Sequence, residues 1–115
     1  MTFKNALLQV AVEDLQEPLN DLLESVRLFV ANGEKAWGRV IGQLLRVSGI
    51  IKDYRLLGIC CREFLESFHP KTVIVVNVCF DLCELFGIHD AEARVARFDE
   101  ICRAAKYVIQ TEWRA

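Results

Sequence analysis

The sequence predicts an all-α protein that forms a single domain over residues 1–115. Apolar residues recur at spacings of three and four along nearly the whole chain, which is the period of an amphipathic helix. Hydrophobic residues make up 53% of the sequence, enough to build a core, and the 26% of charged residues are too few for a disordered tail. We therefore expect a bundle of about six helices.

Two helices are expected before residue 33, with Pro18 between them. Residues 3–16 place apolar side chains on one face, and Pro18 should end this helix because proline lacks an amide donor and clashes with the preceding turn. A cleaner amphipathic pattern then runs over residues 19–30. It stops at Asn32 and Gly33, a typical helix C-cap.

The segment from residue 35 to about residue 53 is apolar around nearly its whole circumference. Such a helix belongs in the middle of a bundle, so we expect it to be the central helix. Gly38, Gly42 and Gly49 fall near one stripe of this helix, where a neighbouring helix or a ligand could approach the backbone closely. For Gly42 and Gly49, tight internal packing explains the glycine equally well.

Further helices are expected over residues 54–68 and over residues 79–86, the second ending at Gly87. Between them, residues 72–78 have the β-branched composition of a strand. We nevertheless predict a helix there, because no second strand signal could pair with it and a lone strand leaves its backbone unsatisfied. Asp90 is expected to cap a last amphipathic helix.

Several functional classes are disfavoured by composition. The net charge of −2 leaves no basic excess for nucleic acid. The longest apolar run, residues 73–80, is interrupted by Asn77 and falls far short of the roughly 20 residues of a membrane span. Because residues 1–16 lack a secretory signal pattern, we expect a cytoplasmic protein without an integral membrane segment.

Neither a metal, a cofactor nor an enzymatic activity is predicted. The five cysteines are an odd number on apolar helical faces, which indicates reduced thiols rather than a disulfide framework. Cys79 and Cys83 lie one turn apart, but neither histidine completes a zinc-ligand spacing. The polar residues that could carry catalysis show no spacing of a nucleophile, a base and an orienting group; they are Glu13, Asp14, Cys61 and His69.

Residues 37–39, Trp-Gly-Arg, are the most informative stretch. Tryptophan favours burial, arginine keeps its charge, and the glycine costs about 1 kcal/mol relative to alanine in a helix. This cost is explained if a partner packs against the bare backbone at Gly38. Arg39 is then a candidate anchor for a carboxylate of that partner, and the alternative is an internal ion pair with an acid such as Glu34.

Two stretches resemble homology motifs of the Bcl-2 family of apoptosis regulators. Residues 36–40, Ala-Trp-Gly-Arg-Val, together with Leu28-Phe29 and Gly33 before them and Ser48-Gly49 after them, resemble the first motif. Residues 80–87, Phe-Asp-Leu-Cys-Glu-Leu-Phe-Gly, resemble the tail of the second motif. Their order and interval are close to those of cellular members, and the resemblance covers the chain from about residue 19 to residue 87.

This resemblance implies a binding module with a hydrophobic groove for an amphipathic BH3 helix. Arg39 would pair with the ligand aspartate, Gly38 would allow close approach, and Phe86 would close one end of the groove. The groove floor would come from apolar residues for which burial in the core is the alternative; they are Leu23, Val26, Phe29, Val40 and Leu44. Trp37 would be chiefly a packing residue.

The sequence also departs from the family pattern. Ala36 replaces the usual asparagine of the first motif, and about 18 residues precede Leu19, too few for two helices of normal size. These features suggest a compact viral homologue that forms a homodimer to cover exposed core surface. Its expected function is to inhibit apoptosis in the host cytoplasm by sequestering pro-apoptotic BH3 proteins, with association to mitochondria through those partners.

A second interpretation stays open. Some viral proteins with the Bcl-2 fold inhibit innate immune signalling through protein contacts and have no BH3 groove. The Trp-Gly-Arg sequence of residues 37–39 favours the groove-bearing class. Binding of BH3 peptides, and its loss in Arg39→Ala, distinguishes the two.

Overall fold

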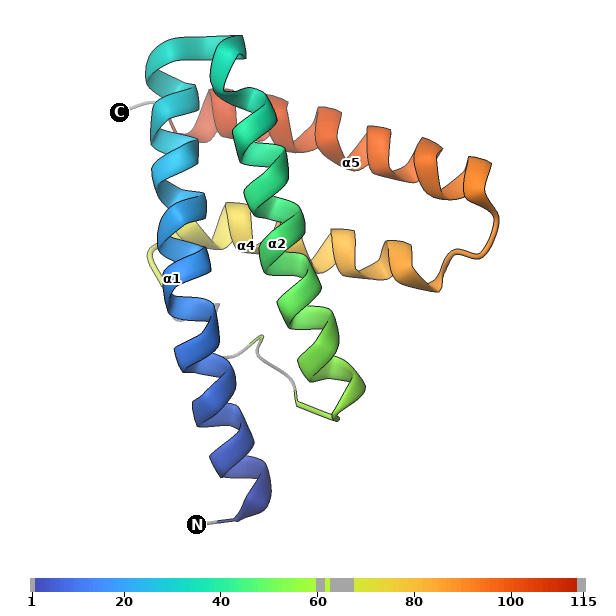
Figure 1. The fold of residues 1–115 in the computed structure, drawn as a ribbon. Coiled ribbons are helices and arrows are strands. Elements are labelled where there is room, and N and C mark those ends of the chain that lie inside the picture. The colour runs from blue at the N-terminus through green and yellow to red at the C-terminus, as the bar shows by residue number, and fades with distance from the viewer. Residues whose placement is uncertain (1, 60–61, 63–67, 114–115) are drawn as a thin grey trace.

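A computed structural model describes residues 2–59, 62 and 68–113, and these form helices joined by short turns (Figure 1). One 3₁₀ segment, Gly33–Ala36, follows the helix that ends at Asn32, and another, Glu84–Gly87, follows the helix that ends at Cys83. The α-helices are α1 (Phe3–Asn32), α2 (Trp37–Leu56), α4 (Pro70–Cys83) and α5 (Ala91–Glu112). None of the described residues lies in a strand, so the predicted all-α class is confirmed.

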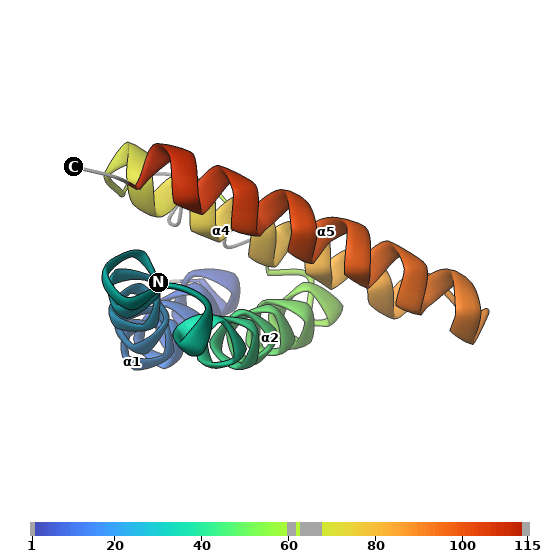
Figure 2. The same ribbon diagram turned by 90° about the horizontal axis from the view of Figure 1, so that it is seen from above.

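The helices form two layers, each an antiparallel pair. Figure 2 shows α1 beside α2 in one layer, and α4 beside α5 in the other. The molecule measures 45 × 37 × 18 Å, and because a helix with its side chains is about 10 Å wide, the shortest dimension is two helices thick. The core therefore lies between the layers, where α2 and α4 face each other.

α1 is one continuous helix, so the prediction that Pro18 separates two helices was wrong. The Oγ1 atom of Thr2 accepts a hydrogen bond from the amide of Asn5 (3.2 Å) at its start. The predicted C-cap is confirmed, because α1 ends at Asn32 and Gly33 follows with a φ of 78°, a conformation that suits glycine.

Burial explains why α1 continues through Pro18. One apolar stripe extends along the helix on both sides of the proline and is almost wholly buried; it comprises Ala11, Leu15, Leu19, Leu22, Val26 and Phe29. Each large apolar side chain contributes about 1.5–3 kcal/mol when buried. Together these contributions outweigh the roughly 3 kcal/mol that a proline costs inside a helix.

α2 is amphipathic, so the prediction that it is the enclosed central helix was wrong. It buries one stripe at helical spacing, formed by Val40, Leu44, Val47, Ser48 and Ile51. Its opposite side carries the three glycines and faces solvent. Leu45, on that side, is 41% exposed. A predicted helix boundary near residue 53 is also absent, since α2 runs without interruption to Leu56.

α4 confirms the helix expected over residues 72–78 in spite of their strand-like composition. It begins at Pro70, and the Nδ1 atom of His69 accepts a hydrogen bond from the amide of Lys71 (3.1 Å). The helix continues to Cys83, so the separate helix predicted from residue 79 does not exist. α4 buries eight of its fourteen residues and is the most enclosed of the described helices.

α5 begins as predicted, because the Asp90 carboxylate accepts a hydrogen bond from the amide of Ala93 (3.2 Å). Near its end, the Trp113 indole Nε1 donates to the backbone oxygen of Lys71 (2.9 Å) and joins α5 to the start of α4. The helix predicted over residues 54–68 does not begin as expected, because residues 54–56 are the last of α2 and residues 57–58 form a turn; much of the rest lies outside the described residues. Among the helices that are described, none is long and apolar enough to cross a bilayer.

The cysteines within the described ranges are buried free thiols, as predicted: Cys79, Cys83 and Cys102. Burial raises the pKa of all three, with a smaller contribution from the neighbouring Cys83 in the case of Cys79. The Sγ atom of Cys83 also donates to the backbone oxygen of Ser48 (3.1 Å). These thiols are therefore packing groups of the core. Cys60 and Cys61 lie outside the described residues.

Candidate functional site

Arg39 is exposed in the first turn of α2. No hydrogen bond or ion pair joins its side chain to any residue in the described part of the chain. The alternative partner, Glu34, instead forms an ion pair with Lys106 of α5. The guanidinium of Arg39 is therefore available to a ligand, and the internal Glu34 pair is not formed.

Trp37 anchors the start of α2 to the end of α1. Its ring packs against Phe29, with ring centroids 4.9 Å apart and an angle of 49° between the planes. On another side, the Nζ atom of Lys106 lies 5.7 Å from the Trp37 ring centroid. Trp37 is half-buried by these contacts, so its predicted role in packing is confirmed.

The exposed side of α2 forms what we call the glycine face: Gly38, Gly42, Leu45, Gly49 and Leu56. At the helical period of 3.6 residues these positions share one side of α2. A Cβ atom added at Gly38, Gly42 or Gly49 would meet nothing within 4 Å. Internal packing therefore does not require these glycines, and a partner helix could approach the α2 backbone closely along this face.

Most of the residues predicted to floor a groove lie in the core instead. Val26, Phe29, Val40 and Leu44 are at most 1% exposed, and Leu23 is partly buried against the core. A ligand could reach the four buried side chains only if α1 and α2 moved apart. The surface that carries Arg39 is thus a helix face above a closed core.

Phe86 lies far from Arg39, near the other end of α2. Its ring is 50% exposed, and the Nζ atom of Lys52 lies 4.3 Å from the ring centroid. Lys52 follows Arg39 by 13 residues, which is about 20 Å along a helix. Phe86 borders a cavity of about 680 Å³ together with Lys52, Arg55 and Leu56. Arg39 and Phe86 therefore mark opposite ends of α2, with the glycine face running between them.

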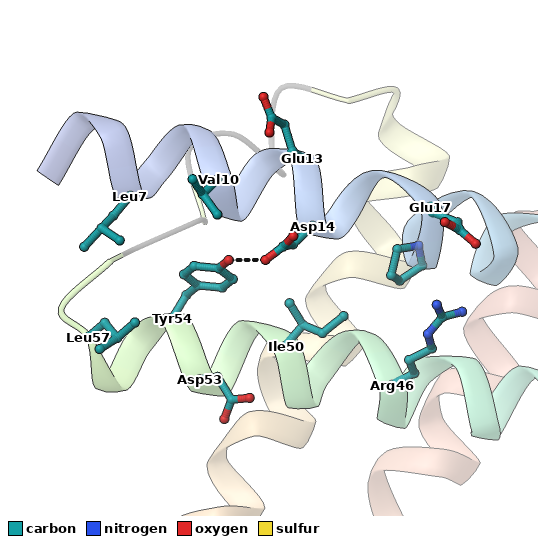
Figure 3. Close-up of a pocket in the computed structure, with 11 residues that line it drawn as sticks. Leu7, Val10, Glu13, Asp14, Glu17, Arg46, Ile50, Asp53, Tyr54 and Leu57 are labelled. Carbon is teal, nitrogen blue, oxygen red and sulfur yellow. Dashed lines mark hydrogen bonds between the residues drawn. The ribbon is translucent and has the colours of Figure 1, made fainter. Parts of the chain in front are cut away.

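A separate cavity of about 650 Å³ lies between the first half of α1 and the second half of α2 (Figure 3). We call it the α1–α2 cavity. Its apolar lining residues are Leu7, Val10, Pro18, Ile50, Tyr54 and Leu57. Its charged lining residues are Glu13, Asp14, Glu17, Asp53 and Arg46. Within the cavity the Tyr54 hydroxyl donates to Asp14, as the dashed line in Figure 3 shows.

The α1–α2 cavity was not predicted from the sequence, because its walls are about forty residues apart in the chain, as the Asp14–Tyr54 contact shows. Its local signal is weak. Val10 and Leu57 continue the apolar periodicity of their segments, yet they are 47% and 63% exposed. No protein-family model, curated protein sequence or solved structure matches this chain. The function is therefore inferred from the molecule's own surfaces.

Proposed function

We propose that this protein binds a BH3-type amphipathic helix along the glycine face of α2 and thereby restrains apoptosis, as a Bcl-2-like inhibitor. The observation that carries the proposal is the exposed Arg39 guanidinium, which has no partner among the described residues and stands beside the bare backbone of Gly38 and Gly42. A ligand carboxylate would neutralise this charge. The apolar side of the ligand would cover Leu45 and Leu56.

The dimensions of the face suit such a ligand. The distance from Gly38 to Leu56 along α2 is about 27 Å, which matches a helical segment of about 18 residues. Glycines at spacings of four and seven allow the two helix axes to come close. Phe86 and Leu56 would then contact the ligand at the end away from Arg39.

Calorimetric titration of synthetic BH3 peptides that carry the conserved aspartate of that motif tests the proposal. A charged hydrogen-bonded pair contributes about 1.5–3 kcal/mol, so Arg39→Ala should weaken binding about tenfold or more. Gly42→Leu should also weaken it by blocking close approach. Arg103→Ala is the matched control, because Arg103 is exposed on α5 and, among the residues that the structure describes, pairs only with Asp99 of its own helix. Absence of binding by every peptide, or equal affinity for Arg39→Ala and the wild type, would contradict the proposal.

The second candidate is a viral inhibitor of innate immune signalling without a BH3 groove. The closed core beneath Arg39 favours it, since Val40 and Leu44 have no exposed surface. For this function, a signalling reporter assay should give the same inhibition with the wild type and with Arg39→Ala.

We also propose that the protein forms a homodimer in which a second copy covers the glycine face. A solution mass of about 26 kDa, twice the 13.2 kDa of one chain, would support it.

A further inference from the structure

The α1–α2 cavity has the properties of a binding surface that is separate from the glycine face. Its volume of about 650 Å³ is within the usual range of ligand sites. Val10 and Leu57 contribute apolar surface that stays largely open to solvent, and Leu7 and Ile50 are half-buried beside them. Clustered apolar side chains around a concavity mark interaction sites more often than scattered ones do.

The rim of the cavity is strongly acidic. Four carboxylates line it and a single arginine opposes them. That arginine, Arg46, already pairs with Asp21 of α1, with 3.0 Å between its Nη1 atom and a carboxylate oxygen. Glu13 and Glu17 lie one turn apart on α1, and neither forms a hydrogen bond or an ion pair with another described residue. On the α2 side, the Nζ atom of Lys52 lies 3.8 Å from the Oδ1 atom of Asp53 and offsets part of the negative charge of the rim.

We propose that the α1–α2 cavity binds an amphipathic helix of a partner protein whose flanks carry lysine or arginine. The cavity runs along α1 from Leu7 to Glu17, about 15 Å, which accommodates apolar anchors at positions i, i+3 or i+4, and i+7 of a ligand helix. Those anchors would contact Val10, Ile50 and Leu57. Basic flanks would face Glu13 and Glu17 on one side and Asp53 on the other.

The sign of the charge separates this ligand from the one proposed for the glycine face. An acidic helix would meet repulsion from the carboxylates of the cavity, and like charges at an interface disfavour binding. A basic helix gains attraction before contact as well as in the complex. The proposal therefore does not rest on BH3 binding at Arg39, and each can fail without the other.

Two synthetic helical peptides with identical leucine anchors test this proposal, one with lysine and the other with glutamate at every flanking position. We expect the lysine peptide to bind, as measured by fluorescence anisotropy, and the glutamate peptide not to bind. Raising the ionic strength from about 0.05 M to about 0.5 M should weaken the lysine peptide severalfold, because exposed charges are screened. Equal binding of the two peptides, or binding of neither, overturns the proposal.

Variants identify the site. The triple variant Glu13→Gln, Glu17→Gln, Asp53→Asn should weaken the lysine peptide at least about tenfold, because it removes the attraction at the rim. The matched control neutralises three exposed acids outside the cavity lining, Glu24→Gln, Glu92→Gln and Glu112→Gln, and changes the net charge equally. It should retain nearly the wild-type affinity. Equal losses in both variants would mean general electrostatic attraction and would overturn the assignment of the site.

Two further measurements separate the remaining outcomes. Val10→Lys places a charge on the exposed apolar floor without opening the core, and it should also abolish binding of the lysine peptide. Arg39→Ala should leave this binding unchanged, which keeps the result independent of the glycine face. If the triple variant instead converts a dimer into a monomer, the occupant is a second copy of the chain and the proposal of a basic partner helix fails.

Discussion

The glycine face and the α1–α2 cavity lie on two sides of the same helix and have opposite properties. The glycine face is flanked by the exposed Arg39, presents bare backbone at three glycines beside Leu45 and Leu56, and lies above a closed core. The cavity is concave, has an apolar floor, and is bordered by four carboxylates. Arg39, the charge proposed to anchor a ligand, therefore lies outside the lining of the α1–α2 cavity.

This difference shows what a local motif can and cannot specify. Arg39 and Gly38 are adjacent in the chain, so the helical period places them about 100° apart around α2, with Arg39 beside the glycine face and not on it. Whether a cavity lies beside them depends on how α1 packs against α2. The fully buried Val40 and Leu44 fill the space beneath the motif, whereas the cavity opens about two turns further along α2, near Arg46 and Ile50.

The largest expected effect tests whether the core beneath the glycine face is closed. Leu44→Ala should lower the free energy of unfolding by about 2–5 kcal/mol, because Leu44 is fully buried and its truncation leaves a cavity. Leu45→Ala is the matched control on the next residue, and its 41% exposure predicts a loss of less than about 1.5 kcal/mol. Urea denaturation measures both. Comparable losses would break the distinction between core and face.

An intermediate effect concerns the wall of the α1–α2 cavity. Pro18→Ala should raise the free energy of unfolding by about 1 kcal/mol. The substitution restores a helical hydrogen bond and removes a clash, and the lost burial of the proline ring offsets part of this gain. Thermal or urea denaturation gives the value. If Pro18 instead began a new helix, where proline is favoured, the substitution would destabilise the protein and the continuous wall formed by α1 would be refuted.

An effect of about the same size is expected one turn after Arg39. The Oε1 atom of Gln43 is buried and has no hydrogen-bond partner among the described residues. Gln43→Leu should raise the free energy of unfolding by about 1 kcal/mol, because an unsatisfied buried acceptor is costly. Gln16→Leu, at an exposed position of α1, should change it by less than about 0.5 kcal/mol. A loss of stability in Gln43→Leu would show that the oxygen has a donor that the substitution removes.

Features that depend on short-range interactions were predicted correctly, and those that depend on long-range packing were not. Caps were predicted correctly at Gly33 and Asp90, because each depends on a backbone conformation or a hydrogen bond within a few residues. The helix over residues 72–78 was also predicted, since pairing requirements exclude a lone strand. Continuity at Pro18 was missed, because it depends on burial against another helix.

The candidate sites follow the same division. Residues 37–39 predicted a packing tryptophan and an arginine that could anchor a ligand. Trp37 packs against Phe29 and Arg39 is exposed, while the binding role of Arg39 stays a prediction. The proposed groove floor could not be separated from core in advance, because apolar periodicity is identical for both. The α1–α2 cavity could not be predicted, since its lining joins residues about forty positions apart.

Helical periodicity, caps and the order of the helices are encoded in short stretches of this chain, because backbone hydrogen bonds and side-chain spacing act over a few residues. Which apolar side chains became core and which stayed exposed was settled by packing between distant segments. Leu44 and Leu45 differ by one position, yet the first is fully buried and the second is 41% exposed. That outcome depends on where α1 and α4 lie around α2, which no local pattern specifies.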